Sequence, residues 1–357
     1  MTQKFPINIL TAPSATADGT KLAVDFYGDT VRLDTDTFTS ASSSGSIYLG
    51  TTAGYTLGVF SSTASSDSFV TKFPFANETI SPVGNITYAP GYNGVYGAHS
   101  GASSTHGYSL GGRTYVPAFT YIATASKFPF ASDTNDSPLG TTLAQTNGFG
   151  SSSMCGNSDF MYVTGGRNGP VYLDSLQKMP TTSDTTMLDI GELTDGADAR
   201  TNQSSSTHGY TSGGSGTSGG VTAYKDIIDK FPFSSDTSAT DIGELVNIVY
   251  AGAGISSSTH GYVAGGILGQ TPAGSDVIQK FSFSSDASAT DVAETNIPIY
   301  ACGGVSSESY GYVTRGYNTP AASYINALQK FSTTSDVSAT DVTEFSNIGG
   351  FGAGLQT

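Results

Sequence analysis

The sequence predicts an all-β fold, a β-propeller of four-stranded units, and three observations lead to this prediction. A short text centred on a lysine recurs six times along the 357 residues. Each repeat alternates apolar and polar residues over short runs that Gly, Ser and Asp separate, which is the pattern of strands joined by turns. No stretch shows the apolar periodicity of an amphipathic helix. Repeated units share one continuous structure, so we expect residues 1–357 to form a single domain.

The repeat is set by six lysines, most of them followed by Phe and often Pro, as in KFPF. Their spacings fall between 50 and 55 residues, which is the period of kelch-type propeller repeats. The six are Lys72, Lys127, Lys178, Lys230, Lys280 and Lys330.

Each unit reads as four short strands. The first is an apolar, Gly-rich run such as 248–255, and the second carries a Gly-Tyr pair, as in GYVAGG. The third contains the lysine, as in DVIQKFSF, and the fourth is the acidic segment ATDVAE. Proline cannot donate a ladder hydrogen bond, so we expect the third strand to lie near a sheet edge or to carry a bulge at KFPF.

The two ends of the chain suggest how the ring closes. Residues 346–357 align without gaps to residues 246–257, so the last segment is the first strand of a further unit. We expect divergent strands within residues 1–40 to complete one blade with 346–357, which seals the ring by pairing the N- and C-terminal strands. That gives seven blades, and the alternative is six blades with residues 1–40 as an extra arm. The expected N-terminal strands are 5–11, 20–28 and 30–34.

Composition excludes several classes of partner. The net charge is −15, so an acidic surface disfavours nucleic acid and anionic membranes. No apolar run reaches about 18 residues, so we expect no membrane insertion. The N-terminus lacks the apolar core of a secretion signal. We expect Cys155 and Cys302 to be buried free thiols.

The repeated SSSTHGY turn raises the possibility of a metal site. It carries His106, His208 and His260, with His99 nearby, but other units have Asp159 or Ser309 at that place. The set is incomplete, so we expect Ser, Thr and His to satisfy backbone groups of a tight turn, with no metal bound.

The SSDxSATD turn carries paired carboxylates, such as Asp286 and Asp291. We expect Asx-turns there, with calcium as the alternative. The repeated lysine suits a structural ion pair with the strand-four Glu of its own unit, for example Lys280 with Glu294. No GxSxG, HExxH, P-loop or CxxC text is present, so we expect no enzyme activity, no catalytic residue and no cofactor.

The segments between the second and third strands differ from unit to unit, whereas the turns at the other face repeat. Variable Tyr and Arg on a constant frame indicate a recognition or docking surface, since these residues most often anchor interfaces. The alternative is unconstrained drift of loop sequence. The predicted binding residues are Arg113, Tyr115, Tyr121, Arg167, Tyr172, Tyr224, Arg315, Tyr317 and Tyr324.

The text SSSTHGY followed by KFPFSSD and SATDIGEL resembles kelch-like repeat proteins encoded by tailed phages of marine bacteria, over about residues 40–345. The resemblance implies a virion structural protein in a tail fibre, an adhesin or a capsid decoration, assembled in the host cytoplasm. It implies no catalytic residues. Residues 1–40 depart from the repeat and are a candidate attachment to another virion protein.

Three functions follow as hypotheses. The first is a non-enzymatic virion propeller that docks to other virion proteins or binds a glycan or protein of the host surface. The second is a glycan-binding, lectin-type propeller, which predicts repeated aromatic pockets in a chain that has no Trp. The third is a ring enzyme similar in fold to kelch-type oxidases, which would need a metal site at the ring centre.

Overall fold

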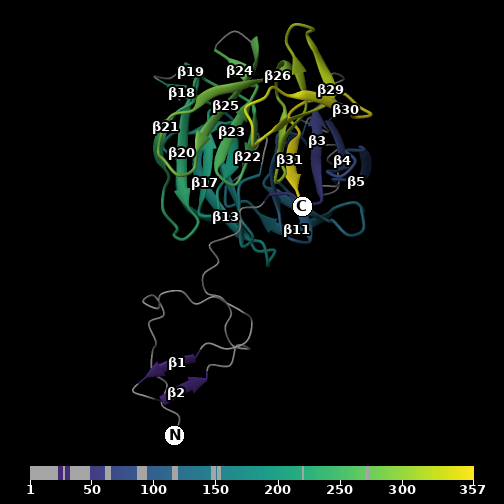
Figure 1. Ribbon diagram of the computed structural model, residues 1–357. Helices are drawn as coiled ribbons and strands as arrows, with labels where there is room; N and C mark the ends of the chain where they lie inside the picture. The colour runs from purple at the N-terminus through teal and green to yellow at the C-terminus, as the bar shows by residue number, and fades with distance from the viewer. Residues whose placement is uncertain are drawn as a thin grey trace. The chain divides into compact units, whose positions relative to one another are not determined.

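The computed structural model describes residues 23–26, 29–32, 49–60, 66–86, 95–114, 120–145, 150, 154–218, 221–269 and 273–357. The chain divides into two compact units, residues 1–44 and 45–357 (Figure 1). In the small unit β1 (Ala23–Phe26) pairs antiparallel with β2 (Asp29–Arg32). The elements in the described ranges are strands. Those ranges contain no helix that is long enough and apolar enough to span a membrane. The all-β prediction is confirmed.

The large unit repeats one antiparallel sheet. The first sheet contains β31 (Ala353–Gln356), β3 (Ala53–Phe60), β4 (Ser66–Pro74) and β5 (Ser81–Asn85). The second contains β6 (His99–Ala102), β7 (His106–Leu110), β10 (Thr124–Pro129) and β11 (Ser137–Thr142). The third has β12 (Phe160–Asn168), β13 (Val171–Pro180) and β14 (Leu188–Glu192), and a bridge from Gly156 to Met161 stands where a first strand would pair.

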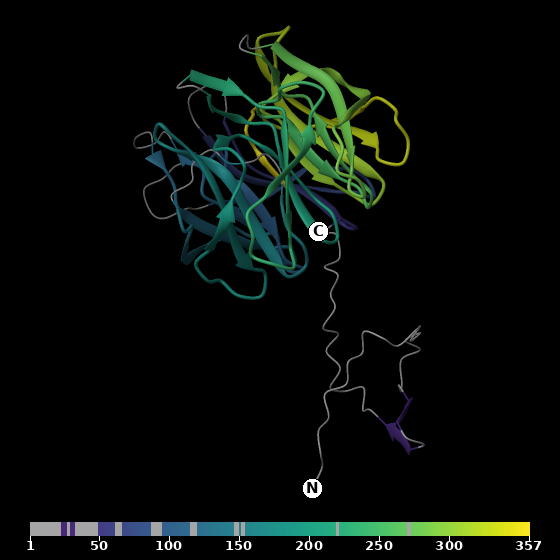
Figure 2. The same ribbon diagram turned by 90° about the vertical axis from the view of Figure 1, so that its left-hand side faces the viewer.

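The remaining copies keep the same order. The fourth sheet contains β16 (Thr201–Ser204), β17 (His208–Ser212), β20 (Ile227–Pro232) and β21 (Thr240–Glu244). The fifth copy contains β22 (Ala253–Ser256), β23 (His260–Ala264), β25 (Ala273–Ser282) and β26 (Thr290–Tyr300). The sixth contains β27 (Gly303–Ser306), β28 (Tyr310–Asn318), β29 (Ser323–Ser332) and β30 (Thr340–Glu344). A short pairing of β26 with β28 joins these two copies. In Figure 2 the sheets follow one another in the order of the colour bar.

The Gly-Tyr and KFPF texts face each other across the second and third strands of each sheet. In the fourth sheet Gly209 lies opposite Phe231, and Tyr210 lies opposite Lys230. A Cβ on Gly209 would lie 2.3 Å from the Phe231 ring, so glycine makes room for that ring. The third strand lies between the second and fourth and not at an edge. The alternative that we expected, a bulge, is present just before KFPF, because the register with the fourth strand shifts between Ile227 and Asp229. Proline is tolerated because it is the last residue of the strand, as Pro232 is in β20.

The repeated tyrosine packs on the two phenylalanines of the next unit. Tyr210 stacks on Phe283 with ring centroids 4.7 Å apart and lies 5.5 Å from Phe281. The same contact runs from the last unit to the first, where Tyr312 lies 5.2 Å from Phe73 and 5.3 Å from Phe75. Aromatic pairs at these distances stabilise beyond their buried area, so they help to join these sheets. The third unit has Met179 in place of the first phenylalanine, and Tyr108 of the second unit belongs to the same buried cluster as Met179.

The repeated lysine makes a structural ion pair, but its partner corrects our prediction. Lys280 pairs with Asp336 of the next unit at 2.7 Å and not with Glu294. The register explains why, because Lys280 lies opposite Thr290 whereas Glu294 lies opposite Val277. The other pairs are Lys72–Asp133, Lys127–Asp184, Lys178–Asp236, Lys230–Asp286 and Lys330–Glu78.

The C-terminal strand also corrects an expectation. We expected its partner within residues 1–40, but β31 pairs with β3, with Leu355 opposite Tyr55. The reason lies in strand order: β3 carries the Gly-Tyr text of a second strand and takes β31 as its first strand. The expected strand at 5–11 lies outside the described residues.

The first strands of the sheets approach one another closely. Strand β31 contacts β6 and β27, and β22 contacts β16 and β27. A Cβ on Gly304 would lie 2.1 Å from the carbonyl oxygen of Gly254, and one on Gly354 would lie 2.1 Å from that of Gly304. The exact repeat of these glycines therefore reflects backbone contact between neighbouring first strands.

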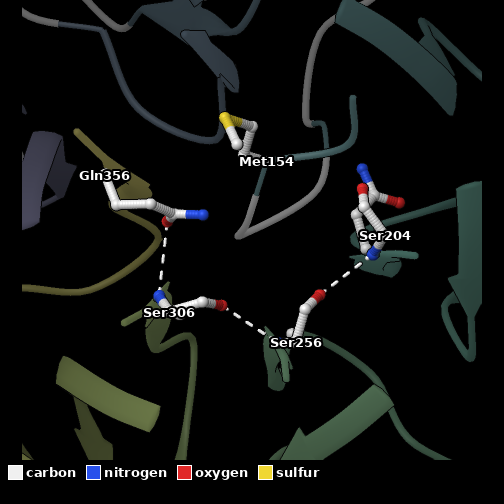
Figure 3. Close-up of a pocket in the computed structure, with 8 residues that line it drawn as sticks. Met154, Ser204, Ser256, Ser306 and Gln356 are labelled. Carbon is white, nitrogen blue, oxygen red and sulfur yellow. Dashed lines mark hydrogen bonds between the residues drawn. The ribbon is translucent and has the colours of Figure 1, made fainter. Parts of the chain in front are cut away.

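Two series of hydrogen bonds join the first strands, one at each end. At one end the amide of Ser204 donates to Ser256 Oγ and that of Ser256 to Ser306 Oγ, both at 2.9 Å, and that of Ser306 donates to Gln356 Oε1 at 3.3 Å (Figure 3). These residues and Met154 enclose a cavity of about 10 Å³, which has room for about one water.

At the other end each first strand is preceded by a residue with positive φ. Ala251, Ala301 and Phe351 have φ near 55°, in the left-handed region. The amide of Ala301 donates to Ala251 O at 2.7 Å, and that of Phe351 donates to Ala301 O at 2.6 Å. Gly97 continues the series by donating to Phe351 O at 2.9 Å. These bonds hold a backbone conformation that costs about 1–2 kcal/mol at each non-glycine residue.

Gly304→Ala tests the close approach of the first strands. We expect a loss of about 3 kcal/mol or more in the free energy of unfolding, because the new methyl group meets backbone that no side-chain rotation can move. Gly269→Ala is the control: Gly269 has φ of 71° and nothing within 4 Å of the added Cβ, so only about 1 kcal/mol of backbone strain is expected. Urea denaturation measures both, and equal losses would contradict the packing argument.

A buried ion pair interrupts the repeat in the fourth sheet. Arg200 Nη1 lies 3.4 Å from Asp229 Oδ2, and both side chains are fully buried. Thr194 also donates its backbone amide to Asp229. Burial lowers the pKa of Arg200 and raises that of Asp229, each against the attraction of the other. Other units place Gln at this position, as at Gln279, which accepts from the amides at 246 and 247.

Asp229→Gln gives this unit the side chain of its neighbours but leaves Arg200 buried without its counter-charge. We expect a loss of about 3–5 kcal/mol in unfolding free energy. The double variant Arg200→Met/Asp229→Gln removes both charges and should recover most of that loss, because an apolar side chain of similar length needs no partner. Thermal and urea unfolding check this, and a double variant no more stable than the single one would count against it.

Candidate binding site

The predicted variable segments connect the second and third strands of the sheets, as expected. Their structures differ: 111–125 holds the hairpin of β8 (Arg113–Thr114) and β9 (Thr120–Tyr121), whereas 164–175 extends β12 and β13 themselves. In the fourth unit β18 (Ser215–Ser218) pairs with β19 (Val221–Tyr224) and with β15 (Ala197–Asp198). Because antiparallel order puts these connections at one end of every sheet, they share one face.

Asp198 lies at the centre of the first group of side chains on this face. It ends β15, just before Ala199, and is 3% exposed. Its Oδ2 lies 3.9 Å from Arg167 Nη1, and its Oδ1 has no hydrogen-bond donor among the described residues. The Arg167 guanidinium lies 4.8 Å from the centre of the Tyr172 ring, and its Nε donates to Gly169 O at 2.8 Å.

The electrostatics of Asp198 follow from its burial. Desolvation raises the pKa of its carboxyl group to about 7, and the charges of Arg167 and Arg113 oppose that rise. Burial also raises the pKa of Tyr250, and the negative charge of Asp198 adds to the rise. Tyr224 stacks on Tyr250 with ring centroids 5.1 Å apart. The carboxyl group, two arginines and two tyrosines therefore form one electrostatic neighbourhood.

Two other predicted residues reach this group from β8 and β9. The Arg113 guanidinium lies 4.7 Å from the centre of the Tyr96 ring, which is buried. The Tyr121 hydroxyl donates to Gly169 O at 3.4 Å, the same carbonyl that accepts from Arg167. Tyr115 lies outside the described residues.

Tyr317 and Tyr324 belong to a second group, on the last unit. The Tyr317 ring lies 5.1 Å from that of Tyr324 and 5.2 Å from that of Tyr300. Tyr324 in turn lies 5.8 Å from Phe60 of the first unit. We call these two groups together the aromatic face; both have half-buried rings that expose part of their surface.

Arg315 is the predicted binding residue that the structure places elsewhere. It is 3% exposed, with its guanidinium 3.8 Å from the centre of the Phe345 ring. Its Nη1 donates to Thr56 Oγ1 at 2.7 Å, and its Nη2 donates to Asn347 Oδ1 at 2.9 Å. Arg315 therefore joins the last unit to the first and does not contribute to the surface. Arg315 stands where other units have the first glycine of a Gly-Gly pair, such as Gly265 with φ of 66°, and its own φ of 50° keeps that backbone conformation.

Sequence reasoning missed Asp198, Tyr250 and Tyr300. Each directly precedes the residue of positive φ at the start of a first strand, Ala199, Ala251 or Ala301. A signal was present, because the Tyr-Ala pairs at 250 and 300 repeat at the period of the units. We read those residues only as part of an apolar strand.

The repeated histidines have the structural role that we predicted. In each SSTH turn the Ser Oγ accepts the His backbone amide, as Ser257 does from His260 at 3.0 Å. Thr259 Oγ1 lies 2.8 Å from His260 Nδ1. Across the ranges that the structure describes, no three His, Cys, Asp or Glu side chains gather where they could hold one metal ion. Cys155 and Cys302 are buried free thiols, as predicted, and burial raises the pKa of each to about 12.

No protein-family model matches this chain, and a search of curated proteins finds no match either. The aromatic face itself offers exposed ring surface, two guanidinium groups and a buried carboxyl group. These groups can stack on apolar or planar surface and exchange hydrogen bonds with a polar partner.

Asp198→Asn tests the electrostatics of this site. The folded-state pKa of about 7 lies above the ordinary aspartate pKa of 3.8, so between these two pH values the folded protein holds a proton that the unfolded chain has lost. Wild-type stability should therefore fall as pH rises from 4 to 7. The neutral amide of the Asp198→Asn variant does not titrate, so this part of the dependence of stability on pH is lost. The variant should also have a free energy of unfolding at pH 8 that is higher by roughly 1–3 kcal/mol.

Urea midpoints measured across this pH range check the prediction. Asp291→Asn, which alters an exposed carboxylate, is the control and should keep the wild-type slope. An Asp198→Asn variant with the wild-type slope would show that Asp198 does not titrate in this window.

Proposed function

We propose that the large unit is a six-bladed β-propeller. Six repeated sheets support six blades in place of seven, with β31 and β3 closing the ring. Two contacts run from the last unit to the first in the same way as between inner neighbours, Lys330 with Glu78 and Tyr312 with Phe73. A further bond from Arg315 to Thr56 also joins the last unit to the first. Six blades, with residues 1–40 as an extra arm, was the alternative prediction.

We propose that this propeller is a non-enzymatic recognition module that docks to other virion proteins or binds the host surface. The observation that carries the proposal is the aromatic face, where Asp198 of β15 meets Arg167 and Tyr172 of the segment 164–175, one of those that differ between units. The sheets beneath these segments repeat their turns and their lysine ion pairs. The segments can therefore differ in sequence without altering the contacts between sheets. The virion assignment rests on the resemblance of the SSSTHGY and KFPF repeats.

The lectin-type alternative is favoured by the half-exposed rings of Tyr172 and Tyr224, since sugar rings stack on such surfaces. Against it, these rings are not in register between units, so this face does not repeat one pocket.

Proteomics of purified particles from the phage that encodes the chain tests the assignment. We expect the chain among the particle proteins, and its absence would contradict a virion role. The variant Tyr172→Ser/Tyr224→Ser should reduce either incorporation into particles or adsorption to host cells by about tenfold, because it removes two anchors of the aromatic face.

Ser285→Ala/Ser335→Ala is the matched control, since it changes two exposed serines of the repeated turns at the opposite face. It should leave both incorporation and adsorption unchanged. If the tyrosine variant behaves like this control, the aromatic face is not the contact surface.

A further inference from the structure

A groove of about 300 Å³ lies between the last unit and the first, on the face of the repeated turns. The residues of its lining that matter here are Thr51, Glu78, Glu308, Ser309, Tyr310 and Lys330. The groove is therefore at the opposite end of the sheets from the aromatic face. Its volume is at the lower end of the range of small-molecule sites.

The groove exists because the repeat is interrupted at this place. In other units an SSTH turn joins the first strand to the second, but β31 and β3 are far apart in sequence, and Thr51 and Thr52 instead donate their amides to Thr357 O. The turn after β4 is also shorter by one residue: Lys72 lies opposite Ser81, whereas Lys280 lies opposite Thr290. Because one turn is absent and the other is shorter, fewer atoms lie between the last unit and the first than between other neighbouring units.

Two turns depart from the SSTH text: 157–160 in the third unit, which reads NSDF, and 307–310, which lines this groove. Three turns read SSTH, at 103–106, 205–208 and 257–260, whereas 307–310 reads SESY. Ser307 keeps its role, because its Oγ accepts the Tyr310 amide at 3.0 Å. The turn itself therefore does not require Glu308 or Tyr310. Tyr310 is 40% exposed, and Glu308 is exposed and makes no hydrogen bond or ion pair with the described residues.

The groove contains charges of both signs. Lys330 Nζ lies 2.7 Å from Glu78 Oε1 and 4.9 Å from the centre of the Tyr310 ring. The Tyr312 hydroxyl also donates to Glu78 at 3.0 Å, so this carboxylate is already satisfied. A cationic ligand would meet Lys330, and an anionic one would meet Glu308. A neutral ligand that both donates and accepts hydrogen bonds avoids either repulsion.

We infer that this groove binds a neutral saccharide of one or two rings. The C–H face of a sugar ring would pack on Tyr310, its hydroxyl groups would donate to Glu308, and its oxygens would accept from Lys330 and Ser309. A carboxylate acceptor makes stronger hydrogen bonds than a neutral one. This site is separate from the aromatic face and does not depend on the virion proposal.

Ligand-observed saturation-transfer NMR on the full chain tests the inference. The probes are a neutral hexose, an N-acetylhexosamine, a deoxyhexose and a pentose, with their disaccharides, at millimolar concentration. We expect saturation transfer to at least one of them. In the variants Glu308→Gln and Tyr310→His we expect affinity for that sugar to fall about tenfold or more, since each removes one main contact. Histidine stands at this position in three other turns, at 106, 208 and 260, so we expect the Tyr310→His variant to keep the fold.

Ser258→Glu/His260→Tyr is the matched control. It places the same two residues in a turn that faces no such groove, and it should leave sugar binding unchanged. Absence of transfer to every probe overturns the inference. Binding that survives Glu308→Gln and Tyr310→His also overturns it, because the sugar then binds elsewhere, such as on the aromatic face. Binding of an arginine or lysine peptide that excludes the sugars would assign the groove to a cationic ligand and overturn it as well.

Discussion

The close approach of the first strands is the constraint on which the rest of the structure depends. The backbones at Gly254, Gly304 and Gly354 are so near that a Cβ on either of the last two would lie 2.1 Å from a neighbouring carbonyl oxygen. Side chains cannot fill the space between these strands, so hydrogen bonds must satisfy their polar groups. The serine series at one end and the backbone series at the other supply those bonds. The first strands at 253–256, 303–306 and 353–356 must then keep Gly at the same register, which accounts for the 50-residue repeat of Gly254, Gly304 and Gly354.

Farther out, the sheets are joined by side chains that reach from one unit to the next. The tyrosine of one unit packs on the phenylalanines of its neighbour, and the lysine pairs with an acid of that neighbour's turn. The exposed lysine pairs contribute little individually, since surface ion pairs are worth about 0–1 kcal/mol. The buried aromatic contacts carry more of the stability. The lysine therefore acts mainly on register: it fixes which turn lies beside which strand, and its stem covers the aromatic pair.

The sequence predicted the units and the strands well because periodicity reports on local pairing. It failed where the answer depends on contacts between units. Lys280 was matched to Glu294 because both belong to one repeat, but the strand register separates them and brings Asp336 to the lysine. The C-terminal strand was correctly identified as a first strand, yet its partner β3 could not be distinguished from candidates within residues 1–40. Arg315 was read as a surface residue because its contacts with Thr56 and Asn347 cannot be seen in the sequence, although its alignment with glycines of positive φ, such as Gly265, was visible there.

The two candidate sites arise from the same geometry in different ways. The aromatic face lies above residues that must adopt positive φ to join the backbone series of hydrogen bonds. The side chain that precedes each of these residues, Asp198, Tyr250 or Tyr300, lies at the same end of the first strands. The groove at Tyr310 arises because two segments distant in sequence meet where a turn would otherwise stand. Turns with the same neighbours in every unit can use the same side chains. Between the last unit and the first the neighbours differ, so different side chains there cause the smallest loss of stability. Glu308 and Tyr310 occupy that position, while Ser307 accepts the Tyr310 amide as Ser257 accepts that of His260, so the turn keeps its backbone contact with different exposed side chains.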